Sequence, residues 1–528
     1  MRYLNVFLAV LVSVVLGVLV FEGGLRLFPA FRPTETINRF DPELGWSKKP
    51  DAKIGRSTSE FDITFETNDD GLRDDTPKAK QPSTFRVLML GDSFVLGYTV
   101  DRKNLFVDEL ETWWQAEGRR VDVVNAGTEG YATDQEVLWF EENGAAYAPD
   151  LVLLFPYEND IYWNGQEKYT RFPKPRYRPD GTLEKRELTD PGPRSWFQHT
   201  AIGNLYAKEI APKLARSSGP PPNHFQPAGQ ERWIYDEFAP LFVHQPPFLD
   251  DALARTKGSL LALERRCREL GARLLMVPIP SESAIQEDER QKFQETVLHG
   301  IPADAWSPDR PVDLFLGLGR DLGIETIDVR KKLRMIAEDG GEPLYFAQEW
   351  HFNPRGNETF AEILHEELDA RGVFPADHSA ITEVTLDPVP AHEGGVPTWL
   401  WVFGGLWGLL GVCYAATYRD EKPLLAFLKV GGLLALVFAI VLGGGKLLAL
   451  APPSLGPWLL IGFAVAVLGF VAYKLGRRIA TITELIKAFT LRGHWYLMPL
   501  VVVLLSIGSL LVVAASSPLI APFIYTLF

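Results

Sequence analysis

The chain has 528 residues, which is too long for one ordinary domain. Of these residues 46% are apolar, and the net charge is −14. From residue 397 onward nine Lys or Arg stand against three Asp or Glu, a charge of +6. The first 396 residues therefore carry −20, which argues against nucleic acid as a partner. Cys267 and Cys413 lie in segments of different character, so we expect no disulfide framework. No Cys/His cluster has metal-ligand spacing, and we expect neither a metal nor another cofactor.

The chain opens with an apolar segment at residues 1–31. Residues 4–21 carry no charge, and as a helix they reach about 27 Å, close to the thickness of a bilayer core. A cleaved signal peptide is the alternative, but the sequence after Phe21 is a poor cleavage site. We expect an uncleaved membrane anchor. Arg2 in front of it predicts a cytoplasmic N-terminus and a following domain outside the cytoplasm.

Residues 32–84 are expected to form an extended lead-in that contains a strand near 61–67, where polar and apolar side chains alternate. From residue 85 the pattern alternates between strands and helices. Strands are expected at 86–90, 120–127, 149–155, 272–278 and 325–329. Helices are expected at 105–114, 134–143, 250–270 and 354–368. This alternation predicts an α/β fold, a three-layer α/β/α sandwich around a parallel five-stranded sheet.

Residues 162–250 interrupt the alternation with three Pro-rich patches. We expect an insertion or lid with short helices, set within a domain that spans 85–371. A Pro- and Gly-containing linker follows at 372–396.

The last part of the chain, 397–528, is a predicted membrane domain. Its four apolar spans are 398–416, 424–442, 457–473 and 495–515. Basic residues gather between the first and second spans and between the third and fourth, which are the cytoplasmic sides if the soluble domain lies outside. With the N-terminal anchor, this predicts a five-span protein of the bacterial inner membrane with its soluble domain on the extracytoplasmic side.

Four residues stand where predicted strands end or just before the last helix. Ser93 follows the first buried strand, Gly127 ends the second, Asn159 follows the third, and His351 precedes the final helix. Open parallel sheets place their active sites at the carboxyl ends of the strands. Ser93 is thus a candidate nucleophile and His351 a candidate base. The N–H groups of Ser93 and Gly127 and the amide of Asn159 are candidate oxyanion donors. Taken alone, each residue also fits a turn, a helix cap or a surface position.

The motifs Gly91-Asp-Ser-Phe94, Gly127, Asn159-Asp160 and His351 occur in the order and rough spacing of the SGNH/GDSL hydrolases. Residues of about 85–370 therefore resemble this superfamily of esterases and acyl-ester hydrolases. The resemblance implies a flavodoxin-like α/β/α fold. It also implies Ser93 as nucleophile, His351 as general base, and Ser93, Gly127 and Asn159 as the oxyanion donors.

The residue that orients His351 departs from the family's pattern. The usual position of the acid, three residues before the histidine, holds Gln348, whereas Glu349 stands two residues before it. Glu349-Trp-His-Phe-Asn353 is similar to the Asp-x-His-Trp-Asn pattern of SGNH-like exopolysaccharide acetyltransferases. We take Glu349 as the acid. Asp328 at the end of the fifth strand, or a main-chain carbonyl in place of any acid, are the alternatives.

These features predict a membrane-anchored serine esterase that removes acyl groups, expected to be O-acetyl groups, from envelope or exported glycans. An O-acyltransferase that works with a membrane acyl-donor or polysaccharide-export partner is the first alternative. A non-catalytic subunit of a membrane export or assembly complex is the second. The C-terminal end, about 480–528, resembles a small uncharacterised family of single-span bacterial membrane proteins, which favours a place within a membrane assembly.

Overall fold

The computed structural model describes residues 36–375 except 59, 185, 193–194, 212–222 and 340, together with 18–19, 21–26, 407–408, 424, 427–428 and 431–432. The chain divides into two compact units. The larger consists of residues 34–195 and 212–384, and the other of residues 1–33, 196–211 and 385–528. The predicted N-terminal anchor and the four C-terminal spans lie almost wholly outside the described residues. Among the described residues, no helix is long and apolar enough to cross a bilayer.

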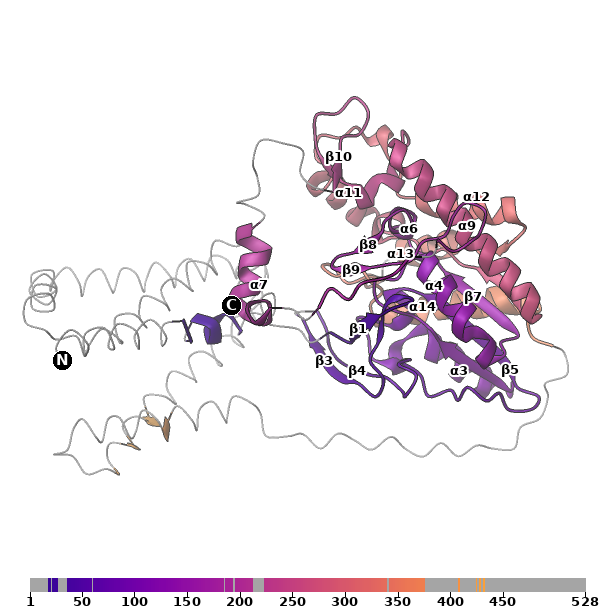
Figure 1. The fold of residues 1–528 in the computed structure, drawn as a ribbon, viewed down its shortest axis with the longest axis horizontal. Coiled ribbons are helices and arrows are strands. Elements are labelled where there is room, and N and C mark those ends of the chain that lie inside the picture. The colour runs from indigo at the N-terminus through magenta and orange to yellow at the C-terminus, as the bar shows by residue number, and fades with distance from the viewer. Residues whose placement is uncertain are drawn as a thin grey trace, which may run out of the picture. The chain divides into compact units, whose positions relative to one another are not determined.

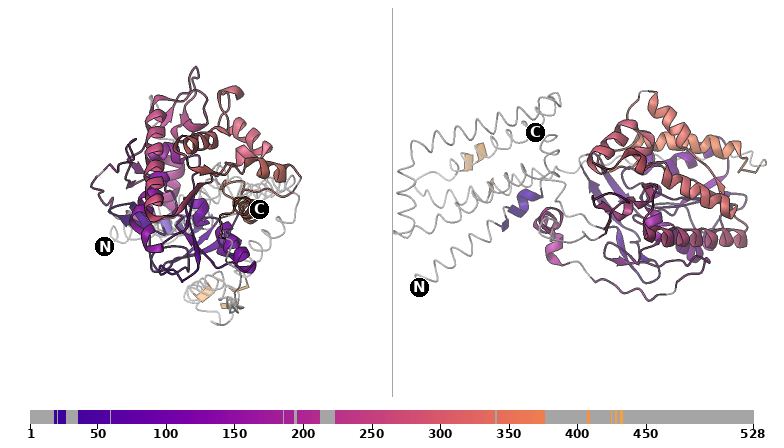
Figure 2. Two further views of the ribbon diagram at one scale, coloured as in Figure 1. Left: turned by 90° about the vertical axis from the view of Figure 1, so that its right-hand side faces the viewer. Right: turned by 90° about the horizontal axis from the view of Figure 1, so that it is seen from above.

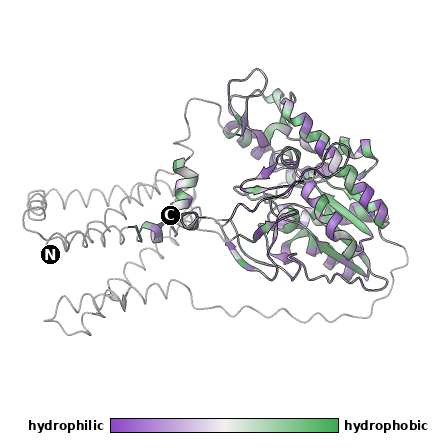
Figure 3. Cartoon of the chain, in the orientation of Figure 1, coloured by the Kyte–Doolittle hydropathy of each residue, from purple (hydrophilic) through white to green (hydrophobic). Residues whose placement is uncertain are grey.

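A five-stranded parallel sheet forms the centre of the larger unit, as the sequence predicted (Figure 1). The strands run in the order β13-β12-β7-β5-β6. They are β5 (Phe85–Gly91), β6 (Val121–Asn125), β7 (Leu151–Phe155), β12 (Arg273–Met276) and β13 (Glu325–Thr326). Every residue of β7 is buried, and the strand is hydrophobic throughout (Figure 3). This is the 2-1-3-4-5 order of flavodoxin-like sheets, in which ligands bind where the order reverses, here beyond the ends of β5 and β7.

Helices cover both faces of the sheet, because the side chains of β5 alternate between two cores. Leu88 and Leu90 pack in one core with α4 (Thr133–Trp139), α9 (Pro247–Leu270) and α12 (Arg310–Leu322). Val87 and Met89 pack in the other with α3 (Phe106–Ala116), α13 (Arg330–Glu338) and α14 (Pro354–Ala370). The result is the expected α/β/α sandwich, seen from two further directions in Figure 2.

Short elements complete the sandwich. They are α2 (Ser93–Leu96), η2 (Arg102–Asn104), η3 (Phe140–Gly144), α5 (Ala145–Tyr147), α6 (Asp160–Asn164), α10 (Glu282–Ile285), α11 (Glu287–Thr296) and η7 (Ala303–Ala305). Two of them, α2 and α6, directly follow β5 and β7, so they begin at the edge of the sheet where the order reverses.

Residues 36–84 fold against the sheet within the larger unit. They form two antiparallel hairpins, β1 (Asn38–Asp41) with β2 (Gly45–Lys48) and β3 (Lys53–Ser57) with β4 (Asp62–Glu66). Arg73 follows the hairpins and is fully buried. Its guanidinium donates to the carbonyls of Leu96, Gly97 and Val100, just past the end of α2. The segment expected as a lead-in therefore supports the element that carries Ser93.

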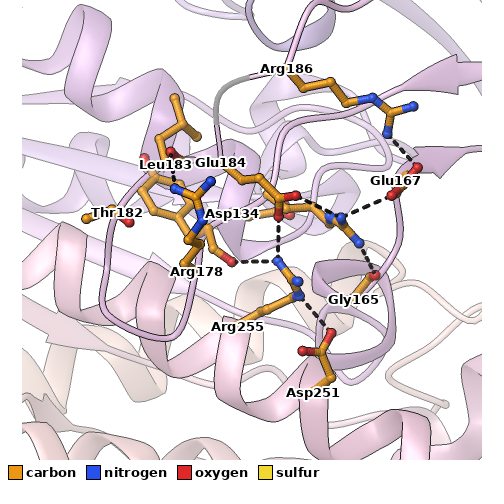
Figure 4. Close-up of polar contacts among 12 residues, drawn as sticks. Asp134, Gly165, Glu167, Arg178, Thr182, Leu183, Glu184, Arg186, Asp251 and Arg255 are labelled. Carbon is orange, nitrogen blue, oxygen red and sulfur yellow. Dashed lines mark hydrogen bonds and ion pairs between the residues drawn. The ribbon is translucent and has the colours of Figure 1, made fainter.

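The segment 162–250 contributes four short strands and a 3₁₀ helix to the larger unit. These are β8 (Lys168–Tyr169), β9 (Phe172–Pro173), β10 (His224–Phe225), β11 (Ile234–Tyr235) and η6 (Asp236–Leu241). A network of ion pairs fixes this segment on α9 (Figure 4). Arg255 of α9 pairs with Glu184 at 2.9 Å and with Asp251 at 2.7 Å, and Arg186 pairs with Glu167 at 2.7 Å.

Part of the same segment belongs to the smaller unit. There η4 (Trp196–His199), α7 (Ala201–Leu205) and η5 (Tyr206–Ile210) follow one another. The carboxylate of Glu22 accepts the first two N–H groups of α7, from Ala201 and Ile202, at 2.9 and 3.0 Å. A carboxylate in this position caps the unpaired N–H groups at the start of a helix.

Candidate active site

Ser93 is the first residue of α2, immediately after β5. The carboxylate of Asp92 accepts the N–H of Phe94 at 2.9 Å and caps the short helix. The corner is too tight for any side chain at Gly91, because an added Cβ would lie 2.3 Å from a methyl carbon of Val95. Gly97 ends α2 in the left-handed region, with φ of 72°. The glycines on either side of Ser93 thus make the sharp corner that sets its hydroxyl at the sheet edge.

The structure brings Ser93 and His351 together across 258 positions of sequence. Ser93 Oγ lies 2.8 Å from His351 Nε2, and His351 Nδ1 lies 2.6 Å from the main-chain carbonyl oxygen of Glu349. A carbonyl oxygen only accepts hydrogen bonds, so Nδ1 must carry the proton. In the neutral ring Nε2 is then an acceptor for the Ser93 hydroxyl. This is the tautomer that a general base for serine requires.

The orienting group for His351 is not the acid expected from the sequence. The Glu349 atom in contact with the ring is its main-chain oxygen rather than its carboxylate. The carboxylate of Asp328, the other acid considered, forms an ion pair with Arg330 at 2.7 Å. The geometry therefore matches the third alternative, a main-chain carbonyl in place of an acid.

The His351 ring lies between two aromatic rings, those of Phe94 and Tyr98, with centroids at 4.6 and 5.4 Å. The guanidinium of Arg56 lies over the ring of Tyr98, 3.4 Å from its centroid. The pKa of His351 is lowered to about 4, chiefly by burial; the bond to the Glu349 carbonyl opposes this shift, and the positive charge of Arg56 adds to it. At neutral pH the imidazole is uncharged and ready to accept a proton.

Gly127 does not occupy the role expected of it. Its N–H donates to the side-chain oxygen of Asn125 at 3.0 Å, and Lys48 binds its carbonyl. An added Cβ would lie 2.2 Å from the main-chain nitrogen of Leu96 in α2. The glycine is thus needed for close contact with α2, and its N–H is already in use.

Gly130, three residues later in the same loop, has the properties expected of Gly127. It adopts φ of 75°, and its N–H makes no hydrogen bond within the described residues. An added Cβ would lie 2.6 Å from the ring of Tyr169. Sequence alone does not separate Gly130 from Gly127, because the two glycines share this loop and differ only in backbone conformation and contacts.

Asn159 stands just before α6, beyond the end of β7. Because Gly91 pairs with Phe155 in the sheet, the segments that carry Ser93 and Asn159 leave it side by side. The Asn159 amide nitrogen donates to Glu237 Oε1 at 3.1 Å, so the side chain does not cap its own helix.

Buried carboxyl groups lie behind the serine. Asp92, Glu136 and Asp160 are all buried, and desolvation raises the pKa of each, that of Asp92 to about 7. One oxygen of Asp92 lies 3.3 Å from Ser93 Oγ. When Asp92 is protonated it is able to donate to this oxygen while Ser93 donates to His351, since a hydroxyl accepts as well as donates.

The wall of a small cavity, about 70 Å³ in volume, includes sequence neighbours of Asn159, Glu237 and His351. These neighbours are Tyr157 and Glu158, Phe238, and Trp350. The cavity wall combines aromatic rings with carboxyl and hydroxyl groups, but neither Ser93 nor His351 is part of it.

One cluster of metal-ligand residues occurs among the described residues, away from the serine. Ligand atoms of Glu117, His365 and Asp369 lie within 4.8 Å of one another. The guanidinium of Arg119 already pairs with Asp369 and with Glu117, at 2.5 and 2.8 Å. Because the guanidinium of Arg119 offsets these carboxylates, little negative charge remains to bind a metal ion.

Comparison with known proteins gives a match to a family model and matches to solved structures. A family model described as a family of unknown function, DUF5989, matches residues 479–528. Among solved structures, the acetyl xylan esterase AlAXEase matches with 11% identity and a TM-score of 0.30, over 54% of this chain and all of that one. A lipase/acylhydrolase from Enterococcus faecalis matches with 16% identity and a TM-score of 0.29, over 55% of this chain and 97% of that one.

A variant of Axe2, an acetyl-xylooligosaccharide esterase from Geobacillus, matches with 12% identity and a TM-score of 0.30, over 55% of this chain and 96% of that one. No curated protein matches the chain. At such identities and TM-scores, activity does not transfer from these structures.

Proposed function

We propose that the chain is a serine esterase or acyl hydrolase whose nucleophile is Ser93. The observation that carries the proposal is the 2.8 Å contact between Ser93 Oγ and His351 Nε2, together with the proton fixed on Nδ1. A serine hydroxyl bonded to an uncharged imidazole at a sheet edge is the arrangement that activates serine for acyl transfer.

In this mechanism Ser93 Oγ attacks the ester carbonyl carbon while its proton passes to His351 Nε2. The carbonyl oxygen becomes an oxyanion, bound by the N–H groups of Ser93 and Gly130 and by the amide of Asn159. The C–O bond to the alcohol then breaks as His351 returns the proton to the leaving oxygen. Water attacks the acyl-enzyme by the reverse sequence and releases the acid and free Ser93.

We take the substrate to be an acyl ester of an envelope or exported glycan, and the site to lie outside the cytoplasm. The uncharged run at 4–21 and the basic clusters of 397–528 support this location. Protease digestion of intact spheroplasts tests it. Cleavage within 36–375 from outside is expected, and protection of that segment until the cells are lysed would overturn it.

Hydrolysis of p-nitrophenyl acetate by the purified full chain tests the reaction. The wild type is expected to turn the ester over and to be labelled by a serine-directed phosphonate. Ser93→Ala should lower kcat by roughly 10⁴-fold or more and lose the label, without a change in melting temperature. An unlabelled and inactive wild type would favour the non-catalytic alternative.

Transfer to an acceptor is the third possibility, and the same preparation distinguishes it. If a glycan hydroxyl takes the acyl group from the enzyme faster than water does, the chain is an acyltransferase. Release of acid at the same rate with and without the acceptor supports the esterase.

A further inference from the structure

A carboxylate from the insertion lies on one of the proposed oxyanion donors. Glu237 Oε1 accepts a hydrogen bond from the Asn159 amide at 3.1 Å and a second from the Trp163 indole nitrogen, also at 3.1 Å. Asn159 and Trp163 are four residues apart, so they lie one above the other at the start of α6. A single oxygen of Glu237 joins the two side chains.

Glu237 is held in place by the fold around it. It belongs to η6, whose next residue, Phe238, packs edge-on against Phe293 with ring centroids 5.3 Å apart. Ala239 and Leu241 of η6 are buried in the core. The carboxylate therefore reaches Asn159 from a packed element rather than from an exposed loop.

The contact decides which way the Asn159 amide faces. A primary amide has two N–H groups on one side and an acceptor oxygen on the other. Asn159 Oδ1 is buried without a hydrogen-bond partner, and among the described residues the bond to Glu237 is the one hydrogen bond of this amide. If that bond were lost, nothing shown would prevent the amide from turning over and presenting its oxygen, which repels an oxyanion.

We propose that Glu237 is a positioning residue, which fixes the Asn159 amide with one N–H bound to its carboxylate and the other free for the oxyanion. This role rests on the proposed serine esterase function. It requires an acceptor oxygen at residue 237, but it does not require a negative charge there. The insertion would then be part of the catalytic apparatus as well as a cover over it.

The test is a double-mutant cycle on the full chain, with kcat and KM measured for p-nitrophenyl acetate. Glu237→Ala is expected to lower kcat about tenfold with KM changed less than twofold. Glu237→Gln keeps an acceptor oxygen and should recover most of that loss. Asn159→Ala should lower kcat about 100-fold, as loss of an oxyanion donor does. Because Glu237 acts only through Asn159, the double variant should match Asn159→Ala within about twofold.

Glu231→Ala is the matched control, since it removes an exposed carboxylate from the same insertion and should change neither constant. Melting temperatures of all variants separate misfolding from lost positioning. A further tenfold loss in the double variant would overturn the role, and so would failure of Glu237→Gln to recover activity. A rise in kcat for Glu237→Ala would mean that the carboxylate blocks the site. An inactive wild type overturns the proposed function and this role with it, whereas an active wild type with additive losses overturns this role alone.

Discussion

The two halves of the proposed catalytic pair are held in different ways. Ser93 lies on a corner, residues 91–97, that is fixed by buried side chains. Arg73 donates to the carbonyls at its end, and Asn125 donates to the carbonyl of Val95 at 2.8 Å. His351 lies on a turn, residues 346–353, that is held mainly by its own backbone. Phe346 N–H donates to the His351 carbonyl at 2.9 Å.

The outer contacts of the histidine turn lie near solvent. The carboxylate of Glu60 accepts the N–H groups of Gln348 and Glu349 at 3.1 Å. Buried polar contacts are costly to break, because the remaining partner stays desolvated, whereas exposed ones are replaced by water. Damage to the serine corner should therefore cost more stability than damage to the histidine turn. The experiments that follow test these two elements of the site.

Arg73→Leu should have the largest effect, on stability. It would leave three carbonyls beyond α2 without their donor, and we expect the free energy of unfolding to fall by roughly 3 kcal/mol. Urea unfolding followed by tryptophan fluorescence measures this. Arg119→Leu breaks a more exposed ion pair with Asp369 and serves as the control, with an expected loss below about 1 kcal/mol. Equal losses in the two variants would contradict the comparison.

The pH dependence of activity should reflect the lowered pKa of His351. His351 must be uncharged to act as a base, and its pKa is lowered to about 4. We expect kcat/KM to stay level down to about pH 4 and then to fall about tenfold per unit. A fall that begins near pH 6.5 would contradict the burial of this ring.

The same shift affects stability in a defined window. Between about pH 6.5 and pH 4 the unfolded chain binds a proton at this histidine and the folded chain does not. Stability from this group is therefore lost as pH falls through that window.

Arg56→Gln removes the positive charge over the Tyr98 ring and should raise the pH below which activity falls, as measured by the pH profile of kcat/KM.

Trp350 tests the backbone of the histidine turn. It has φ of 56°, in the left-handed region, and its side chain is 48% exposed. Trp350→Gly removes the strain and Trp350→Ala keeps it. We expect the glycine variant to be more stable than the alanine variant by about 1 kcal/mol, as measured by thermal unfolding. Equal stabilities of the two variants would mean that the backbone at residue 350 does not keep this strained conformation in solution.

Glu349→Ala should have the smallest effect. The acid of a serine triad contributes about 10⁴-fold to kcat. Here the ring is held by the main-chain oxygen of residue 349, which the alanine variant retains. We expect kcat to change less than threefold. A loss of 100-fold or more with an unchanged melting temperature would show that the carboxylate acts in the substrate complex.

The central sheet was predictable because its strands are short apolar runs between helices, as in β7. Ser93 and His351 were predictable because their motifs occur in order, one at the end of a predicted strand and the other before the last helix. Helices α11 to α13 were missed; α11 is almost wholly polar, and α12 contains a proline and two glycines that weaken the helical pattern.

The errors in the site have one physical origin. The proposed donor N–H of Gly130 and the acceptor for His351 are main-chain groups, which every residue carries, so residue types cannot identify them. Gly127 and Gly130 differ in backbone conformation and hydrogen bonding, and Glu349 acts through its carbonyl. The contact of Glu237 with Asn159 joins residues 78 positions apart, so no local sequence pattern predicts it.

The carbonyl that steers His351 has a consequence for how this site can vary. No substitution at position 349 deletes that oxygen, so the acceptor is protected from point mutation in a way that an aspartate is not. The direction of this carbonyl, however, depends on the peptide planes around Trp350, so a mutation at residue 350 can change it. A proline at 350, which cannot adopt a positive φ, would disable the base while leaving the serine, the histidine and the acceptor atom all in the chain.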